Sequence, residues 1–259
     1  MDNNNFRINI LTTDGPQYDY LIYKLESQFT VGIVIRELGK YQRKKLLLKK
    51  KYYRYFCNRY QWLTRKILGY DKYRQQYFQY PHPLRSRIIN VSDINSIYVA
   101  NLLEKKPCNL YVVMGTSILN TKILKTCRTD IINIHGGHLP DYRGNNCIYF
   151  ACLNNDFEKI ANTIHYLDKG IDTGDIIEIV HPVISDKDNP ETLYCKAKRK
   201  AINRLIKIIH SYKKGERIPR HQQDTNIGKL YKTEERNPKT ALIYGFKKIK
   251  YYIKNRTTI

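Results

Sequence analysis

The stretch INIHGGHLPDYRGNN, from Ile132 to Asn146, carries the clearest structural signal in the sequence. Its first residues have the apolar character of a buried strand. Asn133 and His135 are two positions apart, so both side chains should leave that strand on the same side. Gly136 and Gly137 then let the backbone turn close to a ligand. Ligands of open α/β sheets bind outside the carboxyl ends of strands, so the pair is a candidate site. The alternative is that both side chains only satisfy loop backbone groups.

Outward from this stretch, short apolar runs alternate with amphipathic segments, which is typical of a parallel α/β sheet. We expect strands at Arg7–Leu11, Phe29–Ile35, Arg87–Val91, Leu110–Met114, Ile131–Ile134, Asn162–Leu167 and Asp175–His181. We expect helices at Tyr18–Ser27, Ile94–Lys105, Leu119–Thr126, Asn146–Leu153 and Glu191–Tyr212. For the last helix, Asn189 is a suitable cap, Pro190 fits the first turn and Gly215 follows the end.

Residues 38–80 interrupt this alternation between the second and third expected strands. They hold 13 Lys and Arg, one acidic residue and 12 aromatic residues, a net charge of +12. We expect a helical insertion. Its aromatic side chains could pack on the sheet as a flap, lie on an anionic membrane surface, or, less favoured, stack on the bases of a nucleic acid.

The fold class that follows is α/β, with a mainly parallel Rossmann-like sheet, a basic helical insertion and a short C-terminal tail. Residues 1–215 are expected to form the catalytic domain, and residues 216–259 a basic tail. The 259-residue chain has a net charge of +23: the two basic blocks, 38–80 and 196–259, carry +12 and +15, and the remaining residues carry −4. Such surfaces attract phosphates, nucleic acid or acidic lipid headgroups, although solvated lysines on helix faces would give the same count.

Several classes of site find no support in the sequence. The six cysteines form no C-x-x-C pair and no zinc spacing, and we expect reduced thiols and no metal. The first expected strand is followed by TTDGPQYDY, which is neither a dinucleotide fingerprint nor a P-loop. No secretory signal and no run of 18 apolar residues occurs. We therefore expect a cytoplasmic protein, with peripheral attachment to a membrane as an alternative.

A second informative stretch is TIHYLDKGIDTGDII, from Thr163 to Ile177. A strand should end near Leu167, and a turn follows that holds Asp168, Asp172 and Asp175 between glycines. Three carboxylates within eight residues suit a tight loop over a site. An ordinary Asp/Gly turn between two strands is the alternative.

Together the two stretches resemble the folate-dependent formyltransferase family. The resemblance rests on Asn-x-His with a glycine-rich turn and Leu-Pro-x-Tyr-Arg-Gly, and on the later Asp-x-Gly-Ile-Asp-Thr-Gly-Asp. The family includes glycinamide ribonucleotide, methionyl-tRNA and sugar N-formyltransferases. The turn departs from the family's usual Ser- or Pro-Leu-Leu-Pro, because Gly137-His138-Leu139-Pro140 stands here.

The resemblance implies that Asn133, His135 and Asp172 are catalytic. It implies a pocket for 10-formyltetrahydrofolate, the expected co-substrate, formed by the segment MGTSIL at 114–119 and by the Asp-bearing loop. The residues expected to bind it are Met114, Gly115, Ile118, Leu119, Asp168, Lys169, Gly170 and Ile171.

The expected reaction is formyl transfer to a primary amine. An amino sugar carried on a nucleotide is preferred, because its diphosphate suits a basic protein and only about 45 residues follow the long helix. Glycinamide ribonucleotide is second and methionyl-tRNA third. Water could also replace the amine. The alternative hypothesis from another functional class is a non-catalytic protein with the same fold that binds a membrane or a nucleic acid.

Overall fold

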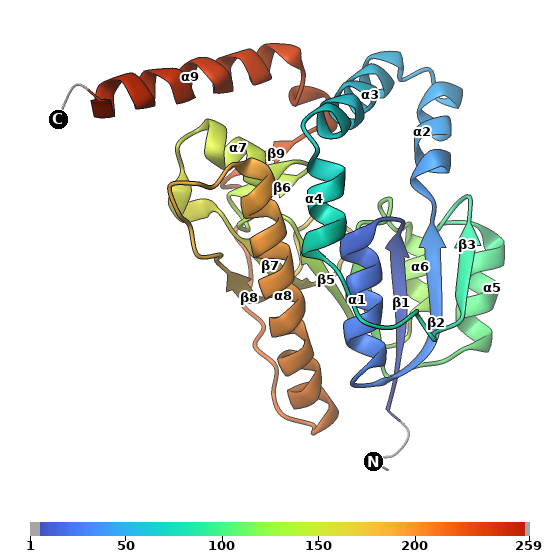
Figure 1. The fold of residues 1–259 in the computed structure, drawn as a ribbon. Coiled ribbons are helices and arrows are strands. Elements are labelled where there is room, and N and C mark those ends of the chain that lie inside the picture. The colour runs from blue at the N-terminus through green and yellow to red at the C-terminus, as the bar shows by residue number, and fades with distance from the viewer. Residues whose placement is uncertain (1–5, 257–259) are drawn as a thin grey trace.

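A seven-stranded sheet forms the centre of the computed structural model, which describes residues 6–256 and their side chains as far as Lys247 (Figure 1). The strand order is β3-β2-β1-β4-β5-β7-β8. The first five strands of that row are parallel, whereas β7 is antiparallel to β5 and β8 to β7. All seven predicted strands are confirmed to within two residues at each end. Their bounds are β1 Arg7–Thr13, β2 Thr30–Glu37, β3 Ile88–Val91, β4 Leu110–Met114, β5 Ile131–His135, β7 Asn162–Tyr166 and β8 Ile176–Val180.

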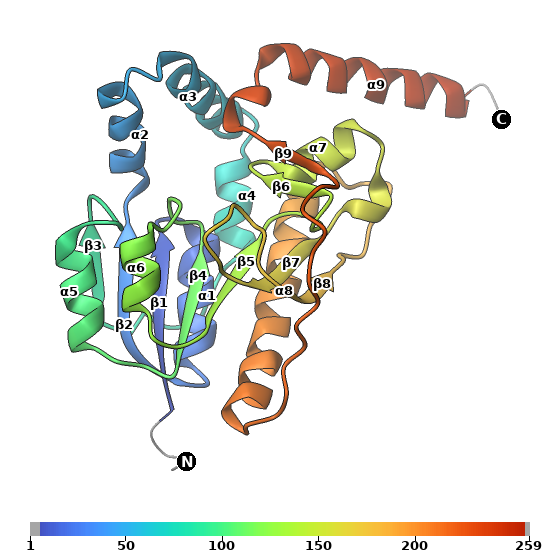
Figure 2. The same ribbon diagram turned by 180° about the vertical axis from the view of Figure 1, so that it is seen from behind.

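Helices cover both faces of the sheet (Figures 1 and 2). Buried residues of α1 (Pro16–Glu26) and α8 (Pro190–Lys213) share one apolar core with β1, β4 and β5. Those of α5 (Ile97–Lys105) and α6 (Thr121–Thr126) form a second core with strand residues of the opposite face. The predicted long helix is confirmed as α8, where the Asn189 side chain accepts from the amides of Glu191 and Thr192.

Two helices start later than their apolar pattern suggests, because a polar residue caps each of them. Ser96 accepts from the amide of Val99 at the start of α5, and Asn120 accepts from that of Ile123 at the start of α6. The predicted helix that begins near Asn146 is α7 (Cys147–Leu153).

The insertion is helical, as predicted, and lies between β2 and β3. It consists of α2 (Gly39–Leu48), α3 (Tyr52–Ile67) and α4 (Tyr70–Tyr77). Phe78, directly after α4, is 1% exposed, and its ring centroid lies 5.7 Å from that of Tyr20 in the main core. The end of the insertion therefore packs as a flap on the sheet's helices, while α2 and α3 extend away from it (Figure 2).

Part of the C-terminal tail is built into the fold. β9 (Lys229–Tyr231) pairs in parallel with β6 (Tyr142–Gly144), which follows the turn after β5. The next turn, η3 (Thr233–Glu235), meets the insertion, because the Gln61 side chain of α3 donates to the carbonyls of Thr233 and Arg236. The last helix, α9 (Pro238–Arg256), extends from this junction. Among the described helices, none has the length and apolar character needed to cross a membrane.

Candidate active site

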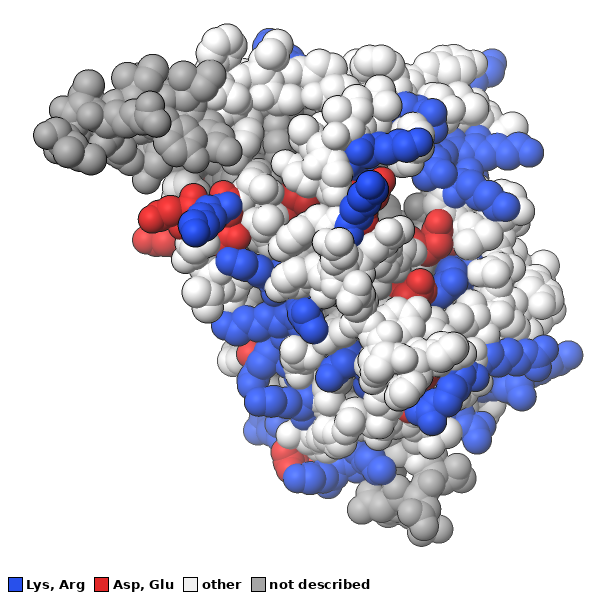
Figure 3. Space-filling model, viewed as in Figure 1, with Lys and Arg blue, Asp and Glu red and all other residues white. Residues whose placement is uncertain are grey.

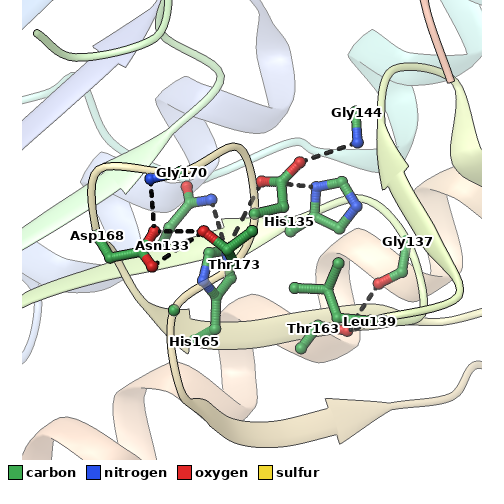
Figure 4. A network of polar contacts seen from close by, with 12 residues as sticks. Asn133, His135, Gly137, Leu139, Gly144, Thr163, His165, Asp168, Gly170 and Thr173 are labelled. Atoms are coloured by element: carbon green, nitrogen blue, oxygen red, sulfur yellow. Dashed lines mark hydrogen bonds and ion pairs between the residues drawn. The ribbon is translucent and has the colours of Figure 1, made fainter. Parts of the chain in front are cut away.

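Asn133 and His135 lie at the carboxyl end of β5, where the sheet changes from parallel to antiparallel pairing. In the register of β5 with β7, Asn133 faces His165 and His135 faces Thr163. The Nδ2 atom of Asn133 is 3.0 Å from Nε2 of His165, so the two side chains are hydrogen-bonded across the strands (Figure 4).

The neighbours of His165 determine its tautomer. Its Nδ1 is 2.7 Å from the carbonyl oxygen of Tyr166, which can only accept, so Nδ1 carries the proton. Nε2 then accepts from Asn133 Nδ2. Burial lowers the pKa of His165 to about 4, which keeps the ring neutral at neutral pH. Among the described residues, the second N–H of the Asn133 amide has no acceptor, and it is available to a ligand.

Asp172 lies on the loop between β7 and β8 and reaches His135. Its Oδ1 is 3.3 Å from His135 Nδ1 and 3.8 Å from His165 Nε2, and its Oδ2 accepts from the amide of Gly144 at 2.9 Å. Asp172 has a φ of 55°, in the left-handed region that a side chain occupies only at a cost. The contacts of the carboxylate hold this conformation.

A second carboxylate braces the same loop. Asp168 accepts from the amide of Gly170 at 3.0 Å and from the hydroxyl of Thr173 at 2.7 Å (Figure 4). Asp168 therefore shapes the loop, whereas Asp172 faces the histidines.

His135 is held as an imidazolium by acceptors at both ring nitrogens. Nδ1 faces Asp172, and Nε2 is 2.9 Å from the carbonyl oxygen of Tyr142. Burial opposes the charge, but the Asp172 carboxylate outweighs burial and raises the pKa of His135 well above its ordinary value. Burial likewise opposes ionisation of Asp172, yet the charged His135 lowers the pKa of Asp172, with help from the Gly144 amide. The result is a buried ion pair beside a neutral histidine.

The glycine-rich turn allows the close approach around His135. A Cβ atom at Gly137 would lie 2.5 Å from the Tyr142 carbonyl oxygen and 2.6 Å from His135 Nε2, so only glycine fits there. The next residue, His138, points elsewhere, with its Nδ1 2.9 Å from Asp141. The side chain of His138, which is unusual for this turn, therefore does not lie between His135 and the cavity described next.

A cavity of about 1190 Å³ opens in front of these side chains. Its volume exceeds the roughly 300–1000 Å³ of a typical small-molecule pocket. It is lined by all three predicted catalytic residues, Asn133, His135 and Asp172, and by seven of the eight predicted folate-binding residues: Met114, Gly115, Ile118, Leu119, Asp168, Gly170 and Ile171. Lys169 lies instead beside a separate cavity of about 520 Å³. No cluster of three or more metal-binding side chains occurs in the described part of the chain.

Residues 82–209 match the formyl transferase family. The chain therefore carries a formyl transferase domain. Its resemblance to that family, inferred from the two motifs, is confirmed. A methionyl-tRNA formyltransferase of Halothermothrix orenii is 30% identical over 160 residues, which is 61% of this chain and 50% of that protein. The chain thus spans about half the length of the curated relatives it matches.

Solved structures confirm the Rossmann-like formyltransferase fold. A phosphoribosylglycinamide formyltransferase from Anaplasma phagocytophilum superimposes with a TM-score of 0.57 at 18% identity, over 82% of this chain and 89% of that one. A sugar 3N-formyltransferase crystallised in the presence of dTDP and 5-N-formyl-tetrahydrofolate has a TM-score of 0.54 at 18% identity, over 87% and 69%.

Two residues of this candidate site were not predicted from the sequence. His165 stands inside the quoted motif, but only the antiparallel register of β7 places it opposite Asn133. Lys198 of α8 is 4% exposed and lines the cavity. Among 46 Lys and Arg residues nothing local distinguishes it, except that it falls on the apolar face of an amphipathic helix.

Proposed function

We propose that this protein transfers a formyl group from 10-formyltetrahydrofolate to a primary amine. The observation that carries the proposal is the joint position of Asn133, His135, His165 and Asp172 in the wall of a cavity with room for two substrates. Direct transfer needs that room, because the donor and the acceptor must be bound together.

Asn133 and His135 would stabilise the charge that develops during transfer. When the amine attacks the formyl carbon, a C–N bond forms and negative charge collects on the formyl oxygen. The second N–H of Asn133 is the donor available to that oxygen, and the positive charge of His135, whose own N–H groups face Asp172 and Tyr142, stabilises it electrostatically. Loss of one such donor typically costs about 2.7–4 kcal/mol of transition-state stabilisation.

Asp172 would move the proton that the reaction has to relocate. The attacking nitrogen must release one proton, and the folate nitrogen must gain one as its bond to the formyl carbon breaks. Among the described residues the Asp172 carboxylate accepts from His135 and from the amide of Gly144, and it can take this proton directly or through a water molecule. No net gain or loss of protons results.

The folate side of the cavity has features that suit a flat, partly apolar ring. Leu119 and Met114 are buried there, whereas Ile118 and Ile171 are partly exposed toward solvent. A Cβ atom at Gly115, where φ is +81°, would lie 2.4 Å from the Tyr18 ring. The backbone of this loop therefore packs directly against the Tyr18 ring, which also lines the cavity.

For the acceptor, we propose an amino sugar carried on a nucleotide. The basic lining of the cavity supports a phosphate-bearing acceptor. Glycinamide ribonucleotide is the runner-up and methionyl-tRNA comes third. Mass spectrometry of the amines after incubation with 10-formyltetrahydrofolate would test the proposal through the N-formyl product. Formate released without such a product would instead identify water as the acceptor. If neither formed with any amine, the protein would be the non-catalytic binder.

A second proposal concerns the insertion: we infer that α3 attaches the protein to an anionic membrane surface. Tyr52, Phe56, Leu63 and Ile67 follow helical spacing along α3 and are 48–72% exposed. The opposite side of the same helix holds the buried Gln61. An apolar stripe that faces solvent needs a partner.

The charge around that stripe favours lipid as the partner. Lys and Arg side chains gather over the region of α2 and α3 (Figure 3). A basic amphipathic helix of this kind lies in the headgroup region of an anionic bilayer and leaves it at high salt. Sedimentation with anionic vesicles tests whether α3 attaches the protein to a membrane.

A further inference from the structure

Three cations from distant parts of the chain line the cavity on the side of α8. They are Arg74 of α4 in the insertion, Lys198 of α8, and Arg236 of the C-terminal tail. Burial lowers the pKa of Arg236 and outweighs the opposing effect of Tyr149 and Glu191, and Arg65 and Arg74 lower it further; burial and then Arg74 lower the pKa of Lys198. Arg74 therefore lies close enough to each of the other two cations to repel it, and Arg74 and Lys198 both lie over the Tyr194 ring.

Lys198 is the most deeply placed of the three. It is 4% exposed, and its Nζ lies 3.8 Å from the position that a Cβ atom on Gly136 would take, immediately beside His135. Among the described residues it takes part in no ion pair, and its ammonium group is 5.7 Å from the centre of the Tyr194 ring. The nearby Asp172 does not balance it, because that carboxylate is already paired with His135.

Of the other two cations, only Arg74 has a carboxylate partner. Both Nε and Nη2 of Arg74 contact the Glu191 carboxylate, and the guanidinium stacks over the Tyr194 ring. Arg236 donates to the side-chain oxygen of Asn146 at 3.1 Å and lies over the Tyr149 ring, but forms no ion pair with a described residue. The set therefore has three positive charges and one negative charge.

Two uncompensated positive charges in a cavity are costly unless an anion reaches them. A phosphate monoester or a diphosphate diester carries two negative charges and matches this excess. Guanidinium forks and an ammonium are also the donors that proteins use to hold phosphate oxygens.

We propose that Lys198, Arg74 and Arg236 bind the phosphate group of a phosphate-bearing amine and so hold that amine beside His135. This inference rests on the proposed formyl transfer and names the class of its acceptor. Both basic blocks of the sequence would then contribute to one phosphate site. The insertion supplies Arg74, α8 supplies Lys198 and the C-terminal tail supplies Arg236.

Titration calorimetry with inorganic pyrophosphate, at about 0.15 M salt and without folate, tests the subsite. We expect saturable binding to the wild-type protein. Lys198→Met and Arg236→Met should each weaken it at least about tenfold, because each removes a charge-assisted hydrogen bond to the phosphate. The matched control is Lys200→Met, two residues along α8, where the exposed ammonium donates to the His181 carbonyl. It should bind pyrophosphate like the wild type.

Thermal melting shows whether each variant is folded and whether pyrophosphate stabilises it. Lys198→Met removes a buried unpaired charge, so without a ligand it should melt at or above the wild-type temperature. Pyrophosphate should raise the melting temperature of the wild type and not that of the variant. No pyrophosphate binding by the wild type, or unchanged binding by both folded variants, would overturn the subsite.

The subsite and the reaction can fail separately. In transfer assays with the wild type, pyrophosphate should compete with the amine and not with the formyl donor. Transfer that pyrophosphate does not inhibit would overturn the subsite and leave the reaction in place. Pyrophosphate binding with no formyl transfer to any amine would overturn the proposed function and leave the anion site.

Discussion

Replacement of Asp172 by Asn should change how the stability of the protein depends on pH. In the wild type the Asp172 carboxylate raises the pKa of His135 above its unfolded value of about 6.5. The ion pair then stabilises the fold fully below about pH 6.5, and this contribution is lost as pH rises toward the folded pKa. One proton changes the unfolding free energy by about 1.36 kcal/mol per pH unit, so up to about 2 kcal/mol is lost between pH 6.5 and 8.

In Asp172→Asn, burial acts on His135 without an opposing carboxylate. The pKa of His135 then falls below that of the unfolded chain, and the sign reverses. Above about pH 6.5 the contribution of His135 to the free energy of unfolding does not change with pH. Below that pH the folded protein loses stability as the pH falls. His165 does not disturb the comparison above pH 6.5, because burial keeps it neutral in the folded protein.

Urea unfolding of both proteins between about pH 6.5 and 8 measures the effect. The wild-type advantage over Asp172→Asn should shrink by up to about 2 kcal/mol over this range, while groups common to both proteins cancel. Asp168→Asn is the matched control, since this carboxylate lies on the same loop and contacts Gly170 and Thr173 rather than a histidine. An advantage that stayed constant across the range would refute the buried ion pair.

Three further outcomes are expected. Asn133→Ala or His135→Ala should lower turnover at least about a hundredfold in folded protein, and near-normal steady-state rates in both variants would mean that the chemistry lies elsewhere. Burial lowers the pKa of Lys198 to about 8, so the KM for a phosphate-bearing acceptor should rise above that pH; a KM that stayed flat to pH 9.5 would count against a charged contact. The protein should sediment with phosphatidylserine vesicles at low salt and be released at high salt, and the double variant Phe56→Ser, Ile67→Ser should not sediment. Failure of the wild type to sediment would end the membrane proposal, and retention of single-stranded RNA on a filter would favour nucleic acid instead.

The sequence alone determined the elements and the identity of two motifs. Apolar runs of four to seven residues placed all seven strands of the main sheet, because the apolar strand interior is a local signal. Asn189 and Pro190 fixed the start of α8 for the same reason. Asn133 and His135 could be paired on one side of a strand, since side-chain alternation needs no knowledge of neighbouring strands.

The tertiary structure decided which residues meet. His165 faces Asn133 only because β7 is antiparallel to β5, and nothing within either strand specifies that pairing. Arg74 and Arg236 stand 162 positions apart, and they line one cavity because α4 packs on the core while β9 pairs with β6. Lys198 resembles its many neighbours until the fold buries it. Register, pairing and burial depend on contacts between distant segments, which a local pattern does not encode.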